Sequence, residues 1–476
     1  MKSVLIGRVQ EQKELDSIYN SGKPEFISVY GRRRVGKTYL VKQHFNTRLD
    51  FYVTGVYEGR MSDQLSNFNK ALNQYGEDSY PQAKNWFDSF DQLKALINHT
   101  NKERVLVFID ELPWFDTPKS NFTKALELFW NSWGADQDKL MLIVCGSATT
   151  WMTKKLMGSK GGLYNRLTHS IYLSPFTLKE TADFIESRSI KFNIAQIVEC
   201  YMIMGGIPYY LDKLQKGLSL AQNIDALFFK KNAPLRKEYK FLFSSLFNDS
   251  PNYTKVINLL CQKNKGMTRK EILEELKIGA GSNLTEILDN LCNCEFTRKY
   301  YAFGKKERDA IYQLIDLQTL FHLRFVNEDQ GIDENFWTNT TNSPLRSNWQ
   351  GYAFEQVCLH HLRQIKQALS VENILTNACS WTTGKSDGSQ DGAQIDLVLD
   401  RKDQIVDLCE IKYCDMLYEI TKDYANKLTT RIDLFREKTK TRKALHLVMI
   451  TPFGLKNNLY AGLIQNEITL DDLMKF

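Results

Sequence analysis

One loop constrains the fold of this chain more than any other stretch of its sequence. Residues 30–38 read YGRRRVGKT and match the pattern GxxxxGK followed by Ser or Thr. The apolar residues 26–30 before the loop predict a buried strand, and residues 39–43 after it predict a helix. Backbone N–H groups and the helix dipole at such a junction attract an anion. The sequence therefore predicts a polyphosphate site in an α/β fold, and the plainer alternative is a basic turn between a strand and a helix.

The residue types in this loop predict how ATP would be held. Lys37 is expected to reach the β- and γ-phosphates, and the Thr38 hydroxyl is expected to complete a Mg²⁺ shell. Gly31 and Gly36 give the backbone a freedom that a Cβ would forbid. The residues of this stretch that we predict to bind the nucleotide are Gly31, Arg34, Val35, Gly36, Lys37, Thr38 and Tyr39.

Length and composition bound the kind of protein. A chain of 476 residues is too long for one core and suggests about three domains. A net charge of +6 permits a polyanionic partner without requiring one. The nine cysteines include no CxxC pair, which argues against a zinc site or a disulfide framework. With no apolar run of about 18 residues and no signal-type segment, we expect a cytoplasmic protein without a membrane anchor.

A second strand supplies the acids that a phosphate loop needs. Residues 105–109 form a continuous apolar run, as in a strand buried on both faces of a parallel sheet, and Asp110 and Glu111 follow it. Asp110 is expected to hold Mg²⁺ through water, and Glu111 is expected to act as general base on the attacking water. The alternative is that Asp110 caps the next helix.

Two further positions complete the predicted ATPase site. The apolar run 140–145 ends in a stretch where Ser147 or Thr149 could sense the γ-phosphate, or could simply cap a helix. Arg166, which precedes the predicted strand 170–173, is a candidate arginine finger.

Five motifs in this half of the chain resemble one family. They are YGRRRVGKT, FIDELPW, CGSATTWM, LYNRL followed by LSPF, and GGIPYYL. Together they are similar to the archaeal-type ATPases of the AAA/STAND group over roughly residues 1–245. The resemblance implies a P-loop core over residues 1–175 and a helical lid over 176–250, with Gly205, Gly206 and Pro208 in the lid turn.

The same resemblance extends to the start of the chain. Ile6, Gly7 and Arg8, with Glu11, resemble the opening signature of that family, which implies that Gly7 and Arg8 lie near the adenine. Arg166 matches the arginine that follows the sensor strand in the family. It could act within its own chain or complete the site of a neighbour in a homo-oligomer.

The middle of the chain, residues 251–330, predicts a winged helix. Amphipathic segments at 253–260, 268–276 and 282–291 predict three helices, with Thr268 and Ser282 as N-caps. Residues 297–303 and 310–315 then predict a hairpin whose tip, residues 304–308, is basic.

Whether this module contacts DNA is left open by the sequence. The third helix of a winged helix usually enters the major groove, but here it carries Glu286 and Asp289 and no Lys or Arg. DNA contact and a protein-docking role are therefore both retained. A basic tract just before the module is interpreted as a solvated helix face in preference to a phosphate track; it comprises Lys230, Lys231, Arg236, Lys237 and Lys240.

The C-terminal part predicts a cluster of acids around a lysine. After a polar link near residues 327–348, a helix over 349–359 carries Glu355. Strands over 394–399 and 405–412 follow, and alternation places Glu410 and Lys412 on one side, with Asp396 on the neighbouring strand. Asp396 and Glu410 could bind Mg²⁺ or Mn²⁺, while Lys412 assists the attacking water or the developing charge.

This arrangement resembles the PD-(D/E)xK nuclease superfamily. Asp396, the sequence Glu410-Ile411-Lys412 and the helix-borne Glu355 carry the likeness, although Ile395 stands where the pattern has proline. A helix near 420–437, with Lys427 and Arg431, and a strand at 444–450 suit a restriction-endonuclease-like αβββαβ domain over residues 345–476. An ordinary surface Glu-x-Lys pair on a strand is the alternative.

Three functions follow as hypotheses. The first is an ATP-binding and ATP-hydrolysing enzyme coupled to a metal-dependent DNA nuclease. The second is a nucleotide-dependent switch or regulator that binds DNA or protein without cleaving, and the third is an ATPase that assembles into a ring or filament. The expected fold class is α/β, with a parallel-sheet P-loop core, a helical lid, a winged helix and the C-terminal αβββαβ domain.

Overall fold

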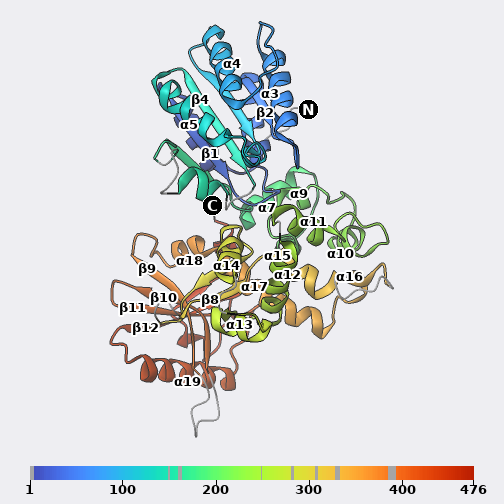
Figure 1. Cartoon of the computed structure of the whole chain (residues 1–476). Helices are drawn as coiled ribbons and strands as arrows, with labels where there is room; N and C mark the ends of the chain where they lie inside the picture. Colours follow the sequence, from blue (N-terminus) through green and yellow to red (C-terminus); the bar gives the residue numbers. More distant parts are fainter. Residues whose placement is uncertain are drawn as a thin grey trace. The chain divides into compact units, whose positions relative to one another are not determined.

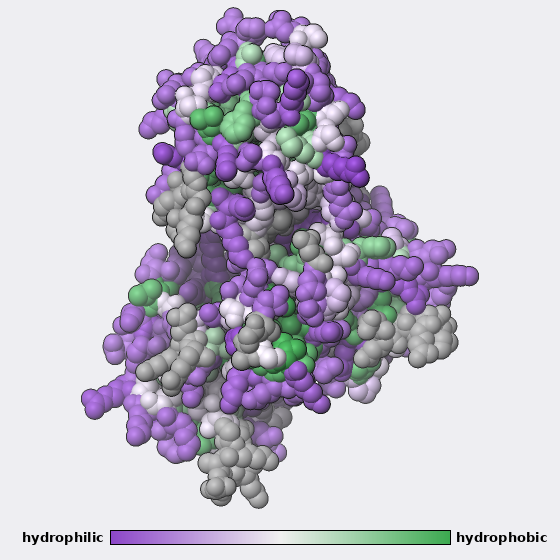
Figure 2. Space-filling model, viewed as in Figure 1, coloured by the Kyte–Doolittle hydropathy of each residue, from purple (hydrophilic) through white to green (hydrophobic). Residues whose placement is uncertain are grey.

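The computed structural model describes residues 5–147, 151–158, 163, 165–247, 249–279, 283–305, 309–326, 333–383 and 393–475. The chain divides into two compact units, Met1–Pro175 and Phe176–Phe476, and each is described by itself (Figure 1). Hydrophilic side chains cover most of the face in view of each unit (Figure 2). Within the described part of the chain, no helix is both long and apolar enough to cross a membrane.

The first unit is built on a parallel sheet in the order β2-β3-β4-β1-β5. Strand β4 lies between β1, which leads into the glycine-rich loop, and β3, which ends at Asp110. Parallel pairing brings the carboxyl ends of all five strands to one edge, so the loop and Asp110 come to the same edge. The strands are β1 (Glu25–Tyr30), β2 (Leu49–Thr54), β3 (Val105–Asp110), β4 (Leu140–Gly146) and β5 (His169–Tyr172).

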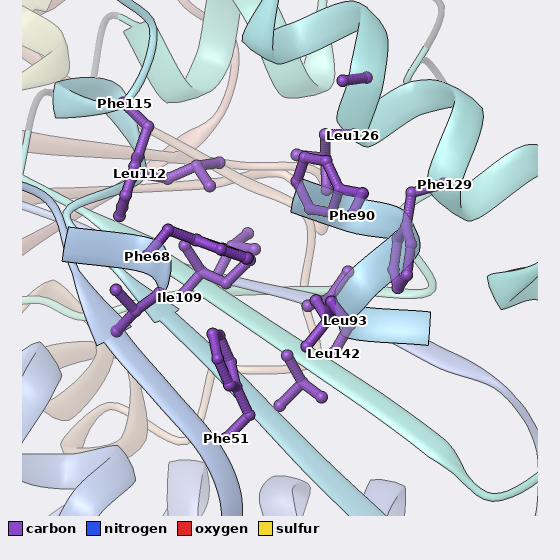
Figure 3. Close-up of a cluster of buried hydrophobic side chains, with 14 of the residues drawn as sticks. Phe51, Phe68, Phe90, Leu93, Ile109, Leu112, Phe115, Leu126, Phe129 and Leu142 are labelled. Atoms are coloured by element: carbon purple, nitrogen blue, oxygen red, sulfur yellow. The ribbon is translucent and has the colours of Figure 1, made fainter. Parts of the chain in front are cut away.

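An aromatic core fixes helices against this sheet (Figures 1 and 3). Phe68, Phe90 and Phe129, from three different helices, are buried, and the Phe90 ring centroid lies 5.8 Å from Phe68 and 5.2 Å from Phe129. Phe51 and Ile109 meet them from the sheet. Burying such large side chains contributes roughly 2 kcal/mol or more each. The helices of this unit are α1 (Val9–Tyr19), α2 (Lys37–Phe45), α3 (Met61–Tyr75), α4 (Trp86–His99) and α5 (Phe122–Ser132), with short turns η1 (Asn46–Arg48), η2 (Leu112–Trp114), η3 (Gly134–Asp136) and η4 (Met152–Met157).

The second unit begins with a helical segment in the region predicted as the lid. Helix α8 ends at Gly205, whose φ of 64° is the left-handed conformation that suits glycine at a helix end. A Cβ on the next residue, Gly206, would collide with the carbonyl oxygen of Phe176, so the turn packs closely. The elements are α7 (Leu178–Ser187), α8 (Ile194–Met204), α9 (Pro208–Leu211), α10 (Leu220–Ile224), η5 (Asp225–Phe229) and α11 (Glu238–Leu246).

The middle module contains three helices and a small antiparallel sheet in the order β6-β8-β7. The predicted cap Thr268 accepts a hydrogen bond from the Glu271 N–H, whereas the predicted cap Ser282 and residues 306–308 of the hairpin tip lie outside the described residues. The elements are α12 (Ser250–Gln262), β6 (Met267–Thr268), α13 (Arg269–Leu276), α14 (Leu284–Asn293), β7 (Thr297–Tyr300) and β8 (Ile311–Leu314).

The expected polar link before the C-terminal domain is wrong in its described part, residues 333–348. This stretch contains helix α16 (Phe336–Asn339) and the start of helix α17 (Pro344–His360), which begins before the predicted residue 349. Trp337 is fully buried, and its backbone N–H donates to the Asp225 carboxylate at 2.7 Å. The polar composition of this stretch does not indicate the buried Trp337, because the burial of one indole stabilises the fold more than several exposed polar neighbours oppose it. Upstream lie α15 (Leu317–Phe321), which packs on α8, and η7 (His322–Val326).

The C-terminal sheet is mixed, in the order β13-β12-β11-β10-β9. Strand β10 pairs antiparallel with β9 on one side and with β11 on the other, and β12 and β13 then add in parallel to β11. The chain passes through the expected αβββαβ order and then adds β13 and α20. The elements are α18 (Leu362–Ala368), β9 (Thr376–Thr382), β10 (Gln394–Arg401), β11 (Ile405–Ile411), α19 (Lys422–Thr439), β12 (Ala444–Ile450), η8 (Ala461–Leu463), β13 (Asn466–Ile468) and α20 (Leu470–Leu473).

Two buried contacts join α17 to the helical segment. Burial lowers the pKa of His361 to about 4, so its imidazole is neutral at neutral pH and its Nε2 accepts the Leu178 N–H at 2.9 Å. Arg346 forms an ion pair with Glu199 on α8, and it donates to the Trp337 carbonyl at 2.9 Å. Both charged side chains of this pair are largely buried.

We predict that Arg346→Met destabilises the second unit by about 3 kcal/mol, because it leaves the Glu199 charge buried and uncompensated. Urea unfolding followed by Trp fluorescence measures this loss. The double variant Arg346→Met, Glu199→Met should regain much of the stability, and Arg436→Met, on an exposed face of α19, is the control. A double variant less stable than Arg346→Met would contradict the explanation.

Candidate functional site

The glycine-rich loop wraps tightly around the start of α2. At Gly31 φ is +146°, and a Cβ there would collide with the carbonyl oxygen of Leu173 just after β5. At Gly36, the residue before the helix, φ is +92°. Arg34 also adopts a positive φ, 75°. Positive φ values of this kind are typical of anion-binding loops, in which successive N–H groups turn toward a common point.

Lys37 places a buried cation inside this loop. Its side chain is 5% exposed, and Nζ donates to the carbonyl oxygens of Gly31 at 3.1 Å and Arg32 at 2.9 Å. Burial lowers the pKa of Lys37, while the groups of Cys145, Glu111 and Asp110 act to raise it. A buried ammonium held by backbone carbonyls at the start of a helix fits a polyphosphate.

Thr38 and Asp110, predicted to share a Mg²⁺ ion, are in contact. The Thr38 hydroxyl donates to Asp110 Oδ2 at 2.8 Å, although 72 residues separate the two in sequence. The other oxygen, Oδ1, accepts the Cys145 S–H at 2.6 Å and the Glu111 N–H at 3.0 Å. No role is predicted for Cys145 from the sequence, although its place at the end of the predicted strand 140–145 was an available signal.

The donor set beside the loop fits Mg²⁺ bound together with a nucleotide. Among the described residues, no three His, Cys, Asp or Glu side chains come close enough to hold a metal ion by themselves. Mg²⁺ commonly takes one or two protein oxygens and completes its shell with phosphate and water. A hydroxyl and a carboxylate in direct contact suit that role.

Glu111 is held by Ser147. Glu111 has a left-handed backbone, with φ 48°, and its Oε2 accepts both the N–H and the hydroxyl of Ser147, at 3.1 and 2.9 Å. Non-glycine residues in this conformation cost about 1 kcal/mol or more and tend to mark functional sites. Ser147 thus reaches the predicted general base, and the alternative sensor, Thr149, lies outside the described residues.

Of the remaining predicted ATPase residues, one is buried against the loop and two are exposed. Arg8 is buried and donates to the Val35 carbonyl at 3.2 Å, so the segment containing Gly7 lies against the glycine-rich loop. Tyr39 is 43% exposed on α2. Arg166 is also exposed, and among the described residues no hydrogen bond or ion pair joins it to Asp110 or Glu111.

A second candidate site gathers the four predicted residues of the C-terminal domain. Glu355 comes from α17, Asp396 from β10, and Glu410 and Lys412 from the end of β11. Lys412 Nζ lies 2.8 Å from Glu410 Oε1, so these two side chains share a face, as alternation predicts. Asp396 accepts a hydrogen bond from Gln394 at 2.8 Å.

Helix α19 contributes two partners to this cluster. Tyr424 donates to Glu410 Oε1 at 2.8 Å, and Arg431 Nη1 lies 2.7 Å from Glu410 Oε2. The sequence predicts Arg431 on this helix without a partner, and Tyr424 is not among the predicted residues. Their spacing of seven residues puts both on one helix face and was the available signal.

The charges in the cluster are unevenly balanced. Burial acts to raise the pKa of Glu410, but Lys412 and Arg431 lower it overall. Burial and the neighbouring Asp396 raise the pKa of Glu355 to about 8, and burial and Glu410 raise the pKa of Asp396. Glu355 and Asp396 therefore hold a proton more readily than ordinary carboxyls do, and a hard divalent cation at their oxygens would favour the ionised form, whereas both Glu410 oxygens are already paired.

Comparison with known proteins identifies the first half of the chain. Residues 5–214 match an ATPase domain found predominantly in Archaea. The chain is also 25% identical over 424 residues to the uncharacterized protein MJECL04 of Methanocaldococcus jannaschii, covering 87% of this chain and 88% of that protein.

Solved structures resemble the chain at low sequence identity. The Walker-type ATPase PABY2304 of Pyrococcus abyssi superimposes with a TM-score of 0.50 and 16% identity, over 67% of this chain and 96% of that one. Cdc6p from Pyrobaculum aerophilum gives a TM-score of 0.31 and 14% identity, over 68% and 94%. The first of these likenesses bears on the fold alone. The chain therefore contains an archaeal-type ATPase domain with a parallel-sheet P-loop ATPase core.

Proposed function

We propose that this protein hydrolyses ATP at its glycine-rich loop and that ATP controls a divalent-metal-dependent deoxyribonuclease site in its C-terminal domain. The ATPase domain supports nucleotide hydrolysis. The nuclease part is supported by the 2.8 Å ion pair of Lys412 with Glu410 and by the effect of Asp396, Lys412 and Glu410 on the pKa of Glu355, since both indicate that acids from one helix and two strands lie near one another.

In the proposed ATPase site, each residue has a defined task. Lys37 neutralises charge on the β- and γ-phosphates. Mg²⁺ would supply further neutralisation, held by the Thr38 hydroxyl and, through water, by Asp110. Glu111 takes a proton from the water that attacks the γ-phosphorus, and ADP and phosphate leave.

In the proposed nuclease site, Asp396 and Glu355 hold the divalent cation and Lys412 serves the chemistry. Such an ion can polarise a phosphodiester and activate water. Lys412 lies where its ammonium can orient that water or stabilise the developing charge. A metal role for Glu410 requires exchange of its pairing with Lys412 or Arg431, which is a specific demand of this proposal.

The pairing of Glu410 with Lys412 and Arg431 favours a second function. With both Glu410 oxygens held by cations, the domain could bind nucleic acid or protein without cleaving, under nucleotide control. The exposed face of α14 carries Glu286 and Asp289, which favours a docking role for a winged-helix middle module over groove reading.

The proposed partner of the C-terminal site is DNA, and a homo-oligomer is the proposed assembly in which Arg166 would act on a neighbour. Exposure of Arg166 supports this second role, because an arginine finger supplied to another subunit has to reach beyond its own.

We predict that Lys37→Ala abolishes ATP binding, because the buried cation is lost, and that Glu111→Gln binds ATP but hydrolyses it at least about a hundredfold more slowly. A fluorescent ATP analogue and phosphate release measure the two effects. Lys124→Ala, exposed on α5, is the control. Unchanged hydrolysis in Glu111→Gln would refute its role as base.

Ser147→Ala should lower kcat by roughly tenfold to a hundredfold while leaving ATP affinity within about twofold, because the lost hydrogen bonds release the Glu111 carboxylate from its position. Ser147→Thr retains a hydroxyl and should keep more of the rate. If ATP affinity falls while ADP affinity is unchanged, Ser147 contacts the γ-phosphate instead.

For the nuclease, we expect plasmid nicking with Mg²⁺ or Mn²⁺ that changes on adding ATP. Asp396→Ala and Lys412→Ala should each lose it, because the first removes a cation ligand and the second a catalytic charge. Glu437→Gln, exposed on α19, is the control. Absence of metal-dependent nicking under every condition would leave the non-cleaving switch as the better account.

A further inference from the structure

Two segments of the first unit leave neighbouring strands at the edge of the sheet where the proposed ATPase site lies. One follows β3 and runs from Glu111 to Asp116. The other follows β4 and leads from Ser147 to Trp151, which directly precedes η4. Ser147 donates two hydrogen bonds to Glu111, so one contact between these segments orients the proposed base.

Gly146, the last residue of β4, lies where the two segments pack most closely. A Cβ on this residue would stand 2.7 Å from Cδ of Pro113 and 2.9 Å from Sδ of Met152. Met152 is fully buried. Because even a methyl group would not fit, the start of η4 and the segment after Glu111 are both packed directly on the residue before Ser147.

A hydrogen bond joins the far ends of the same two segments. The Trp151 indole N–H donates to Asp116 Oδ2 at 3.0 Å. The other oxygen of this carboxylate, Oδ1, accepts the hydroxyl of Thr123 on α5 at 3.1 Å. The Trp151 side chain also packs against the buried core of the first unit. Asp116 is therefore attached to α5 and holds Trp151 in a fixed place.

These contacts bear on the position of the Glu111 carboxylate. The Glu111 backbone is left-handed, and its carbonyl accepts the Trp114 N–H at 2.9 Å. The two hydrogen bonds from Ser147 reach the carboxylate only while the segments keep their separation. A displacement of about 1 Å can slow a reaction on the order of a hundredfold. Contacts that fix this separation therefore protect the geometry of the proposed base.

We propose that Asp116 is a positioning residue of the ATPase site. Through its hydrogen bond to Trp151, it holds Ser147 where that serine can orient the proposed base. The packing at Gly146 carries the constraint from Trp151 to Ser147. This inference rests on the proposed hydrolysis of ATP at the glycine-rich loop. Since Asp116 acts through Ser147, its loss should slow turnover without weakening ATP binding.

Phosphate release and ATP affinity test this role. Trp151→Phe removes the N–H but keeps an aromatic ring, and Asp116→Ala removes the acceptor. Each should lower kcat about fivefold and leave ATP affinity within about twofold. Asp116→Asn retains an oxygen acceptor and should keep most of the rate. Trp133→Phe, which alters another half-buried indole on the same core, is the matched control.

A double variant separates positioning from a general loss of structure. Adding Trp151→Phe to Ser147→Ala should slow hydrolysis by no more than about twofold, because the hydrogen bonds that Trp151 helps to position are already absent. A further loss as large as the one that Trp151→Phe causes alone would overturn the proposal. A fall in ATP affinity as large as the fall in kcat would do the same.

Hydrogen exchange of the Ser147 N–H gives a readout that needs no hydrolysis. Without nucleotide, Trp151→Phe should raise this exchange above wild type and Trp133→Phe, because the bond to Glu111 opens more often. Raised exchange in a protein that does not hydrolyse ATP would support the link from Trp151 to Ser147 and refute the proposed hydrolysis. Unchanged exchange and unchanged kcat in Trp151→Phe, with hydrolysis by wild type, would refute the positioning role alone.

Discussion

The carboxylate of Asp110 is the point on which the first unit depends. It is nearly completely buried, so its oxygens need donors, and they receive three: the Thr38 hydroxyl, the Cys145 thiol and the Glu111 N–H. These donors belong to helix α2, strand β4 and the turn after β3. One buried carboxylate therefore fixes the start of the loop helix relative to two strands.

In the C-terminal cluster the buried acid Glu410 has partners of a different kind. The partners of Glu410 are two cations and a phenol, with Lys412 just after the same strand and Arg431 and Tyr424 on α19. Charged pairs of this kind are strong only while their geometry holds. Asp110 is thus satisfied by neutral donors, whereas Glu410 depends largely on charged ones.

The features that can be predicted from the sequence are those in which a chemical motif falls on an element with a clear hydrophobic period. The glycine-rich loop, the strand ending at Asp110 and the shared face of Glu410 and Lys412 each follow from local pattern, because strand alternation and loop glycines act over a few residues. The contact between Ser147 and Glu111 depends on side-chain rotamers across two strands. The β-bridge of Ala302 to Ser380 is a pairing between distant segments, which composition does not encode.

The prediction of a polar link before the C-terminal domain is wrong for a related reason. Its average polarity predicted a linker, but burial of Trp337 is decided by one side chain and its hydrogen bond to Asp225.

The close approach of Gly31 to Leu173 has a mechanical consequence. The Leu173 N–H also donates to the Tyr30 carbonyl at 2.7 Å, so backbone meets backbone at this point with no side chain between. The first unit ends two residues later, at Pro175. The loop and the segment after β5 therefore touch through backbone atoms alone. Any residue larger than glycine at position 31 would act as a permanent wedge in that linkage.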